Sequence, residues 1–99
     1  MGWVNDARRA LAAGRCVSVR PVGGSMRGRV ESGELVTLEP VDPADVSVGD
    51  VVLVAWRGNW LLHLVLERGP EGLSIGNNLG KVNGWVTPSA VLGRVREKP

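Results

Sequence analysis

The 99-residue sequence has no phenylalanine or tyrosine, and only one cysteine and one histidine. A single cysteine, Cys16, cannot form an internal disulfide, and a single histidine, His63, excludes a zinc site built from several histidines and cysteines. We therefore expect a reducing, cytoplasmic setting and no metal or other cofactor. Without phenylalanine and tyrosine, the core has to come from aliphatic residues and the four tryptophans, which favours strands over helices.

The sequence also has no long run of charge or of apolar residues. Its net charge is +2 and the basic residues are scattered, which argues against nucleic acid as a partner. The longest nearly apolar run, residues 60–66, is far shorter than the roughly 20 residues of a membrane span, and we recognise no signal peptide. The sequence thus predicts a single domain, residues 1–99, without a membrane or nucleic-acid partner.

Turn residues and apolar periodicity predict one short N-terminal helix followed by strands. Asn5 or Asp6 can cap a helix over about residues 5–13, and Gly14 stands where a C-terminal cap residue belongs. Residues 16–96 are predicted to form a β core. Its clearest hairpin has strands at residues 50–57 and 60–67, joined by a Gly58-Asn59 turn.

Nearly continuous apolar residues in both hairpin strands predict that both faces of the hairpin are covered. Side chains alternate along a strand, so Trp60, Leu62, Leu64 and Leu66 are expected on one face and His63 on the other. Residues 76–84 are polar and rich in turn residues, and Asn83 before Gly84 is interpreted as a turn residue.

Ser25 stands in a glycine-rich segment, Gly23-Gly24-Ser25-Met26, between two β-like stretches. The two glycines allow the chain to turn sharply and to present the Ser25 hydroxyl and N–H in one direction. A solvated serine in an ordinary turn is the alternative interpretation.

Three sequence words in this order resemble the superfamily of signal peptidases and LexA-like self-cleaving repressors. They are Gly23-Gly24-Ser25-Met26, Gly33-Glu34-Leu35-Val36 and Val48-Gly49-Asp50-Val51-Val52, followed by a histidine on the next strand and by Gly76-Asn77-Asn78. The resemblance covers residues 17–95. It implies a mainly β fold, a coiled sheet like that of LexA and the signal peptidases, here with one short N-terminal helix.

The resemblance implies that Ser25 is the nucleophile of a serine peptidase and that His63 is its general base. A serine hydroxyl needs a neighbouring base to remove its proton, and a neutral imidazole can do so. The backbone N–H groups of Gly24, Ser25 and Met26 are the candidates for holding the oxyanion. The alternative for His63 is a core histidine whose ring bonds to a backbone carbonyl.

The sequence departs from the family pattern around its candidate base. Leu64 stands where members with a histidine base usually have arginine, and Arg27-Gly28-Arg29 replaces a common proline. We find no carboxylate placed to orient the imidazole. Asn77, Asn78 or Asn83 could take that role; the alternative is that they are turn residues, which is the interpretation we favour for Asn83. Ala13-Gly14 resembles a self-cleavage dipeptide of the family, but we interpret it as the helix end.

The leading hypothesis is a small, stand-alone serine endopeptidase that cleaves a peptide or precursor protein after a small residue, through a Ser25–His63 dyad and an acyl-enzyme. Its substrate is expected to bind as an added strand at a sheet edge. The alternative is a non-catalytic peptide-binding or regulatory module with the same fold. A nucleic-acid-binding β-barrel that stacks bases on tryptophans is least favoured. The sequence leaves a monomer or a homodimer open.

Overall fold

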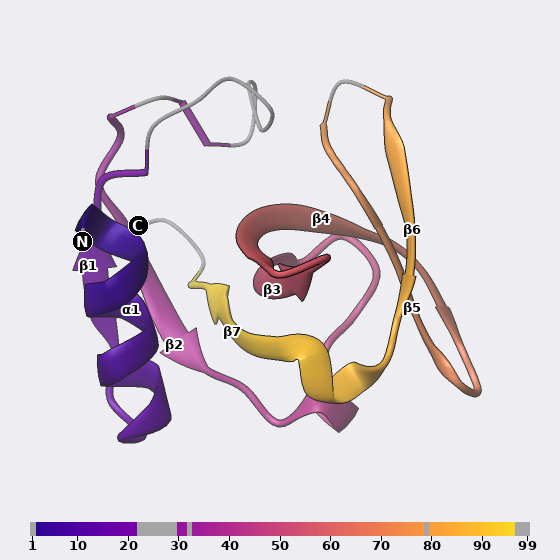
Figure 1. The fold of residues 1–99 in the computed structure, drawn as a ribbon, viewed down its shortest axis with the longest axis horizontal. Helices are drawn as coiled ribbons and strands as arrows, with labels where there is room; N and C mark the ends of the chain where they lie inside the picture. Colours follow the sequence, from indigo (N-terminus) through magenta and orange to yellow (C-terminus); the bar gives the residue numbers. More distant parts are fainter. Residues whose placement is uncertain (1, 22–29, 32, 79, 97–99) are drawn as a thin grey trace.

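The computed structural model describes residues 2–21, 30–31, 33–78 and 80–96. These residues contain one α-helix and seven strands: α1 (Gly2–Ala12), β1 (Val17–Val19), β2 (Val36–Pro40), β3 (Val51–Trp56), β4 (Asn59–Gly69), β5 (Gly72–Gly76), β6 (Val82–Val86) and β7 (Val91–Val95). Two short 3₁₀ turns, η1 (Pro43–Asp45) and η2 (Pro88–Ala90), precede β3 and β7. The predicted mainly β fold with one short N-terminal helix is confirmed (Figure 1).

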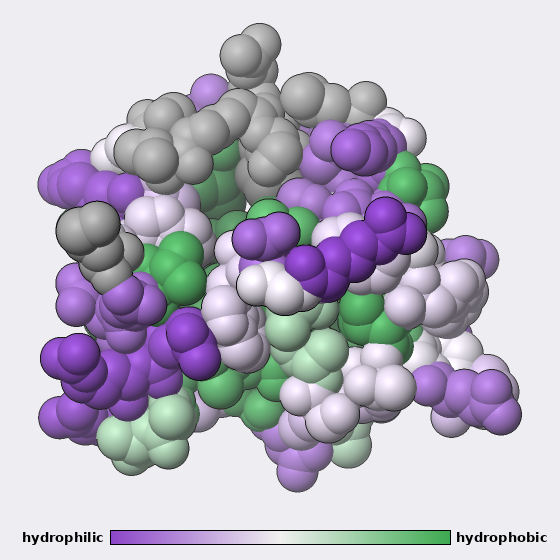
Figure 2. All heavy atoms as spheres, viewed as in Figure 1, coloured by the Kyte–Doolittle hydropathy of each residue, from purple (hydrophilic) through white to green (hydrophobic). Residues whose placement is uncertain are grey.

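All seven strands belong to one antiparallel sheet, in the order β1-β2-β7-β3-β4-β5-β6. The last strand, β7, lies between β2 and β3, so it joins the N-terminal strands to the meander from β3 to β6. The sheet coils, and the β5–β6 hairpin stands on the opposite side of the molecule from α1 (Figure 1). Strongly hydrophilic side chains gather over α1, at the left of Figure 2. No helix in the described ranges is long and apolar enough to cross a membrane.

The central strand β3 is buried on both faces, as its continuous apolar sequence predicts. Val51 and Leu53 pack in a first cluster, which includes residues of α1, whereas Val52 and Val54 pack in a second cluster on the opposite face. The other buried members of the first cluster are Ala7, Leu11, Val19, Val30, Val36, Leu38 and Leu62, and those of the second are Val46, Val65, Leu73, Ile75 and Val91.

α1 begins at Gly2 rather than near residue 5, so the prediction that Asn5 or Asp6 caps it is wrong. The additional turn brings Trp3 against the first cluster, two helical turns from Leu11 on the same face. Trp3 therefore extends the apolar stripe of the helix ahead of both predicted cap residues.

The end of α1 is as predicted. Gly14 has a φ of +77° and donates its N–H to the Leu11 carbonyl at 3.0 Å, and the N–H of Arg15 reaches the Ala10 carbonyl at 2.9 Å. This pair of bonds is a Schellman motif, in which glycine tolerates the left-handed conformation. The Ala13-Gly14 dipeptide is thus part of the helix end.

The turn between β3 and β4 lies one residue earlier than predicted. Trp56 pairs with Asn59, which leaves Arg57 and Gly58 as the two turn residues. Both have positive φ, 48° and 81°, as a type I′ hairpin requires. The predicted Gly58-Asn59 turn is therefore wrong by one residue, because Asn59 belongs to the ladder.

The alternation predicted along β4 holds as far as Leu64, which packs against the first cluster, and His63 projects from the opposite face. A register shift between Val65 and Glu67 then interrupts the ladder with β5. Leu66 lies at this irregularity, so the predicted stripe ends before it.

Arg94 of β7 connects three separate parts of the chain. Its Nε donates to Glu39 Oε2 at 2.9 Å, and its Nη1 contacts Asp50 Oδ2 at 3.4 Å and the Asp45 carbonyl at 3.2 Å. The hydrogen bond to Glu39, supported by the charges of Asp50 and Glu39, raises the pKa of Arg94 despite some desolvation. The guanidinium therefore stays charged and links β2, β7 and the start of β3.

We predict that Arg94→Met lowers the free energy of unfolding by about 1–2 kcal/mol, less than for a fully buried pair because the Arg94 and Glu39 side chains are 31% and 27% exposed. The matched control is Arg96→Met, since Arg96 is 56% exposed and contacts Glu39 at 3.6 Å. Its loss should be below about 0.5 kcal/mol. Urea unfolding followed by tryptophan fluorescence measures both, and equal midpoints would contradict a structural role for Arg94.

Candidate functional site

The proposed nucleophile Ser25 and the proposed oxyanion donors Gly24 and Met26 lie outside the described residues. The residues on either side of this segment are described and are held together. The Gly33 N–H donates to the Pro21 carbonyl at 2.7 Å, and Arg20 Nη1 donates to the Gly33 carbonyl at 3.0 Å. The chain thus enters and leaves the Ser25 segment at neighbouring, hydrogen-bonded positions.

Two of the family-like words, Gly33-Glu34 and Gly49-Asp50, have the same local structure. In each, the N–H of the acidic residue donates to the carbonyl three residues earlier at 3.0 Å, and the carboxylate accepts that earlier residue's N–H at 2.9 Å. The glycine has positive φ, 81° in Gly33 and 96° in Gly49, as at the third position of a type II turn. These words therefore build turns just ahead of β2 and β3.

His63 lies in the middle of β4, one strand from the centre of the sheet. It pairs with Val52 of β3 and is 7% exposed. Its Nδ1 lies 2.6 Å from the carbonyl oxygen of Leu62, the preceding residue. A carbonyl oxygen can only accept, so Nδ1 carries the proton of the neutral ring and Nε2 is left as its proton acceptor.

The charged residue nearest to His63 along its row of the sheet is Arg94. Paired residues project from the same face, and the row runs Glu39, Arg94, Val52, His63 across β2, β7, β3 and β4. Val52 separates the imidazole from the guanidinium, and two strand spacings amount to roughly 10 Å. Among the described residues, no carboxylate is within hydrogen-bonding distance of the His63 ring.

Asn77 closes the connection between β5 and β6. Its Oδ1 accepts from the Lys81 N–H at 2.9 Å, and its own N–H donates to the Lys81 carbonyl at 2.9 Å. Leu64 of β4 pairs with Gly76, the last residue of β5. Because the strands are antiparallel, Asn77 comes opposite His63, one position beyond the end of this ladder. The hydrogen bond seen at His63 Nδ1 goes to the Leu62 carbonyl, and an orienting role for Asn77 or Asn78 stays a prediction.

Asn83 lies within β6, so its interpretation as a turn residue is wrong. The register between β5 and β6 shifts at this point, since Ile75 pairs with Gly84 and Gly76 with Val82. The Asn83 Oδ1 is buried and has no hydrogen-bond partner among the described residues.

A backbone carbonyl is one of the partners expected for the His63 ring, but the residue that provides it, and the contacts of Arg94, are missed from the sequence. A carbonyl oxygen is present in every residue, so no side-chain pattern identifies the one at Leu62 as a partner. The charges of Glu39, Asp50 and Arg94 are visible in the sequence, but only the insertion of β7 between β2 and β3 brings them together.

The geometry at His63 predicts that its neutral ring is the Nδ1–H tautomer. Because the chain has a single histidine, one imidazole spin system is observed in a long-range ¹H–¹⁵N correlation spectrum. For the neutral ring we expect a protonated Nδ1 and an unprotonated Nε2, and His63→Gln should remove the signals. A neutral ring protonated at Nε2 would contradict the bond to Leu62.

Comparisons of this chain with protein-family models, with curated proteins and with solved structures find no match. The relation to signal peptidases and LexA-like proteins is therefore a resemblance of short sequence words. Function has to be argued from Ser25, His63 and the surfaces around them.

Proposed function

We propose that the chain is a serine endopeptidase in which Ser25 is the nucleophile and His63 the general base. The single observation that carries the proposal is the buried His63 ring, whose Nδ1 is bonded to the Leu62 carbonyl at 2.6 Å. A ring held in this way keeps Nε2 available as a proton acceptor. The serine-containing word ahead of β2 supplies the residue that needs such a base.

In the proposed reaction, the Ser25 Oγ attacks the carbonyl carbon of a peptide bond while its proton passes to His63 Nε2. The same proton then goes to the leaving amine as the peptide C–N bond breaks, which leaves an acyl-enzyme. A water molecule, deprotonated by Nε2, attacks the ester, and the proton returns to Ser25 Oγ as the acid product departs. Cleavage after a small residue follows from the family resemblance.

A backbone carbonyl as the partner of Nδ1 also favours the second candidate function, a non-catalytic peptide-binding or regulatory module. A carbonyl oxygen orients the ring but stabilises the imidazolium less than a carboxylate does. A core histidine without catalytic function would have the same bond. The two candidates therefore differ in the reactivity of Ser25, which can be measured directly.

We further propose a cytoplasmic location. Cys16 is exposed and free, and a free exposed thiol is typical of proteins kept in a reducing compartment.

Because the substrate is not known, the test uses a fluorophosphonate probe, whose phosphorus is attacked by an activated serine hydroxyl with loss of fluoride. We expect one adduct on the intact protein by mass spectrometry, mapping to Ser25 and absent in Ser25→Ala. His63→Gln should label at least about 100-fold more slowly, the usual contribution of a general base.

Ser18→Ala is the matched control, since Ser18 lies on β1 and its hydroxyl is 2.9 Å from that of Thr37. It should label like the wild type. Circular dichroism has to show that each variant is folded. A folded wild type that neither labels nor cleaves a proteome-derived peptide library would favour the binding module, and labelling that survives Ser25→Ala would show that another residue reacts.

A further inference from the structure

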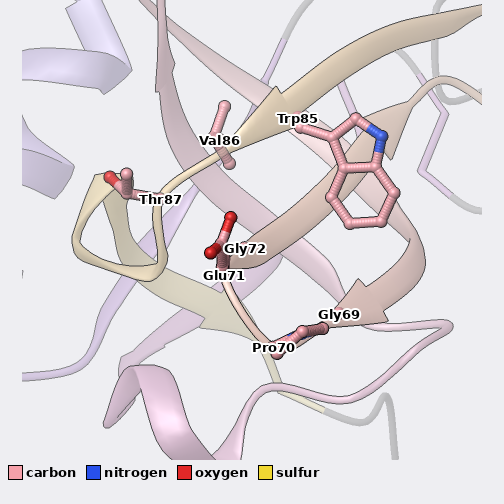
Figure 3. A pocket seen from close by; sticks show the side chains of 7 residues that line it. All are labelled: Gly69, Pro70, Glu71, Gly72, Trp85, Val86 and Thr87. Atoms are coloured by element: carbon pink, nitrogen blue, oxygen red, sulfur yellow. The ribbon is translucent and has the colours of Figure 1, made fainter.

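A hollow of about 390 Å³ lies where the β4–β5 turn meets the end of β6 (Figure 3). Gly69 and Gly72 pair with each other at the turn, so no side chain fills the space between them. A Cβ on Gly72 would lie 2.4 Å from the Val86 carbonyl oxygen, which shows how closely β6 approaches here. The residues lining the hollow are Gly69, Pro70, Glu71, Gly72, Trp85, Val86 and Thr87.

The hollow combines an aromatic ring with a carboxylate. The indole of Trp85 and the carboxylate of Glu71 border the same space, with Thr87 on the other side (Figure 3). Trp85 is 56% exposed and its ring lies beside Gly69, 3.4 Å from where a Cβ would be. An aromatic face and a carboxylate are the two groups that bind a guanidinium or ammonium group.

Two of the other tryptophans, Trp60 and Trp56, already have an arginine of this chain stacked on the ring. The guanidinium of Arg8 lies 5.0 Å from the ring centre of Trp60, and that of Arg57 lies 5.1 Å from Trp56. Among the described residues, no cation stacks on Trp85 and no basic group forms an ion pair with Glu71. The hollow is therefore complementary to an arginine side chain that comes from outside.

The hollow adjoins an edge of the sheet that is open to another strand. β6 is the last strand in the sheet order, so one side of it has no strand neighbour in the part of the chain that the structure describes. Its sequence, Val-Asn-Gly-Trp-Val, contains no charged residue and no proline, the residues that usually protect an edge. Val82 and Trp85 are both more than half exposed.

We propose that the β6 edge binds an extended, arginine-containing segment of a partner protein. The segment adds to the sheet alongside β6, and its arginine enters the hollow, where the guanidinium stacks on Trp85 and pairs with Glu71. Main-chain hydrogen bonds supply affinity in this mode, and the side-chain hollow supplies specificity.

This surface is separate from the candidate dyad, so the inference does not rest on the proposed peptidase function. Trp85 pairs with Ser74 and projects from the sheet face opposite to that of the second cluster, whereas His63 lies on the second-cluster face. Along β4, His63 and Gly69 are six positions apart, a path of at most about 20 Å along the strand at 3.3 Å per residue.

The test measures binding of the peptide Ac-TVRVT-NH₂ to the Ser25→Ala protein, so that proteolysis cannot consume the peptide. Indole N–H signals in ¹H–¹⁵N spectra report on each tryptophan, and Trp85→Phe assigns the one from Trp85. The comparison peptide carries citrulline, a neutral isostere of arginine. We expect the arginine peptide to shift the Trp85 signal and to bind about five- to twentyfold more tightly than the citrulline peptide.

Glu71→Gln should remove most of this preference, because it removes the carboxylate and keeps the shape of the side chain. Glu67→Gln is the matched control: Glu67 is exposed on β4 outside the hollow, and its loss changes the net charge equally. Gly69→Ala, which narrows the hollow beside the Trp85 ring, should weaken the arginine peptide more than the citrulline peptide.

Four results with these peptides and variants would overturn the proposal. They are equal binding of the two peptides, absence of binding at millimolar peptide, an equal effect of the two glutamate substitutions, and a shift of the Trp60 indole in place of Trp85. Agmatine, a free guanidinium compound, can enter the hollow but cannot add to the β6 edge as a strand. It therefore measures the contribution of the hollow alone. Agmatine that binds as tightly as the peptide would exclude strand addition, and much weaker binding supports it.

Discussion

The burial of β3 on both faces is the constraint on which the rest of the fold depends. A strand whose residues alternate between two apolar clusters needs a cover on each side, and a 99-residue chain has few elements to provide it. α1 covers one face. Residues around η1 and η2, with β5 and the coiled end of β4, close the other. β4 is thereby fixed beside β3, and His63 is held on the face of the second cluster.

Burial of His63 creates a requirement that the backbone meets locally. A polar ring taken out of water needs a hydrogen-bond partner, and the Leu62 carbonyl provides one without any other side chain. The hydrogen bond at Nδ1 is equally compatible with a core histidine and with a general base. The difference between these roles lies at Nε2, which is why the reactivity of Ser25, rather than the setting of the imidazole, separates a peptidase from a binding module.

The features predicted correctly are those that a few neighbouring residues determine. Gly14 ends α1, apolar runs form the β3–β4 hairpin, and alternation separates His63 from Leu64. The start of α1 was missed because Trp3, which packs on the first cluster, lies ahead of both predicted cap residues. The contacts of Arg94 and the hollow beside Trp85 join segments that are distant in the sequence, so they arise only when the strands are assembled. The bond from His63 to the Leu62 carbonyl is local, but no side-chain pattern marks it.

The sequence words behind the family resemblance have a physical reason to exist without catalysis. A glycine with positive φ followed by a carboxylate that accepts a backbone N–H makes a turn ahead of β2 and again ahead of β3. These short sequence words therefore reflect the turns that lead into two strands of the sheet. The fold and the reaction can therefore be separated, because the turns do not require Ser25 or His63. Nor does the β6 edge require them, since Trp85 projects from the face of the sheet opposite to that of His63, and the peptide binding proposed there is independent of an active dyad.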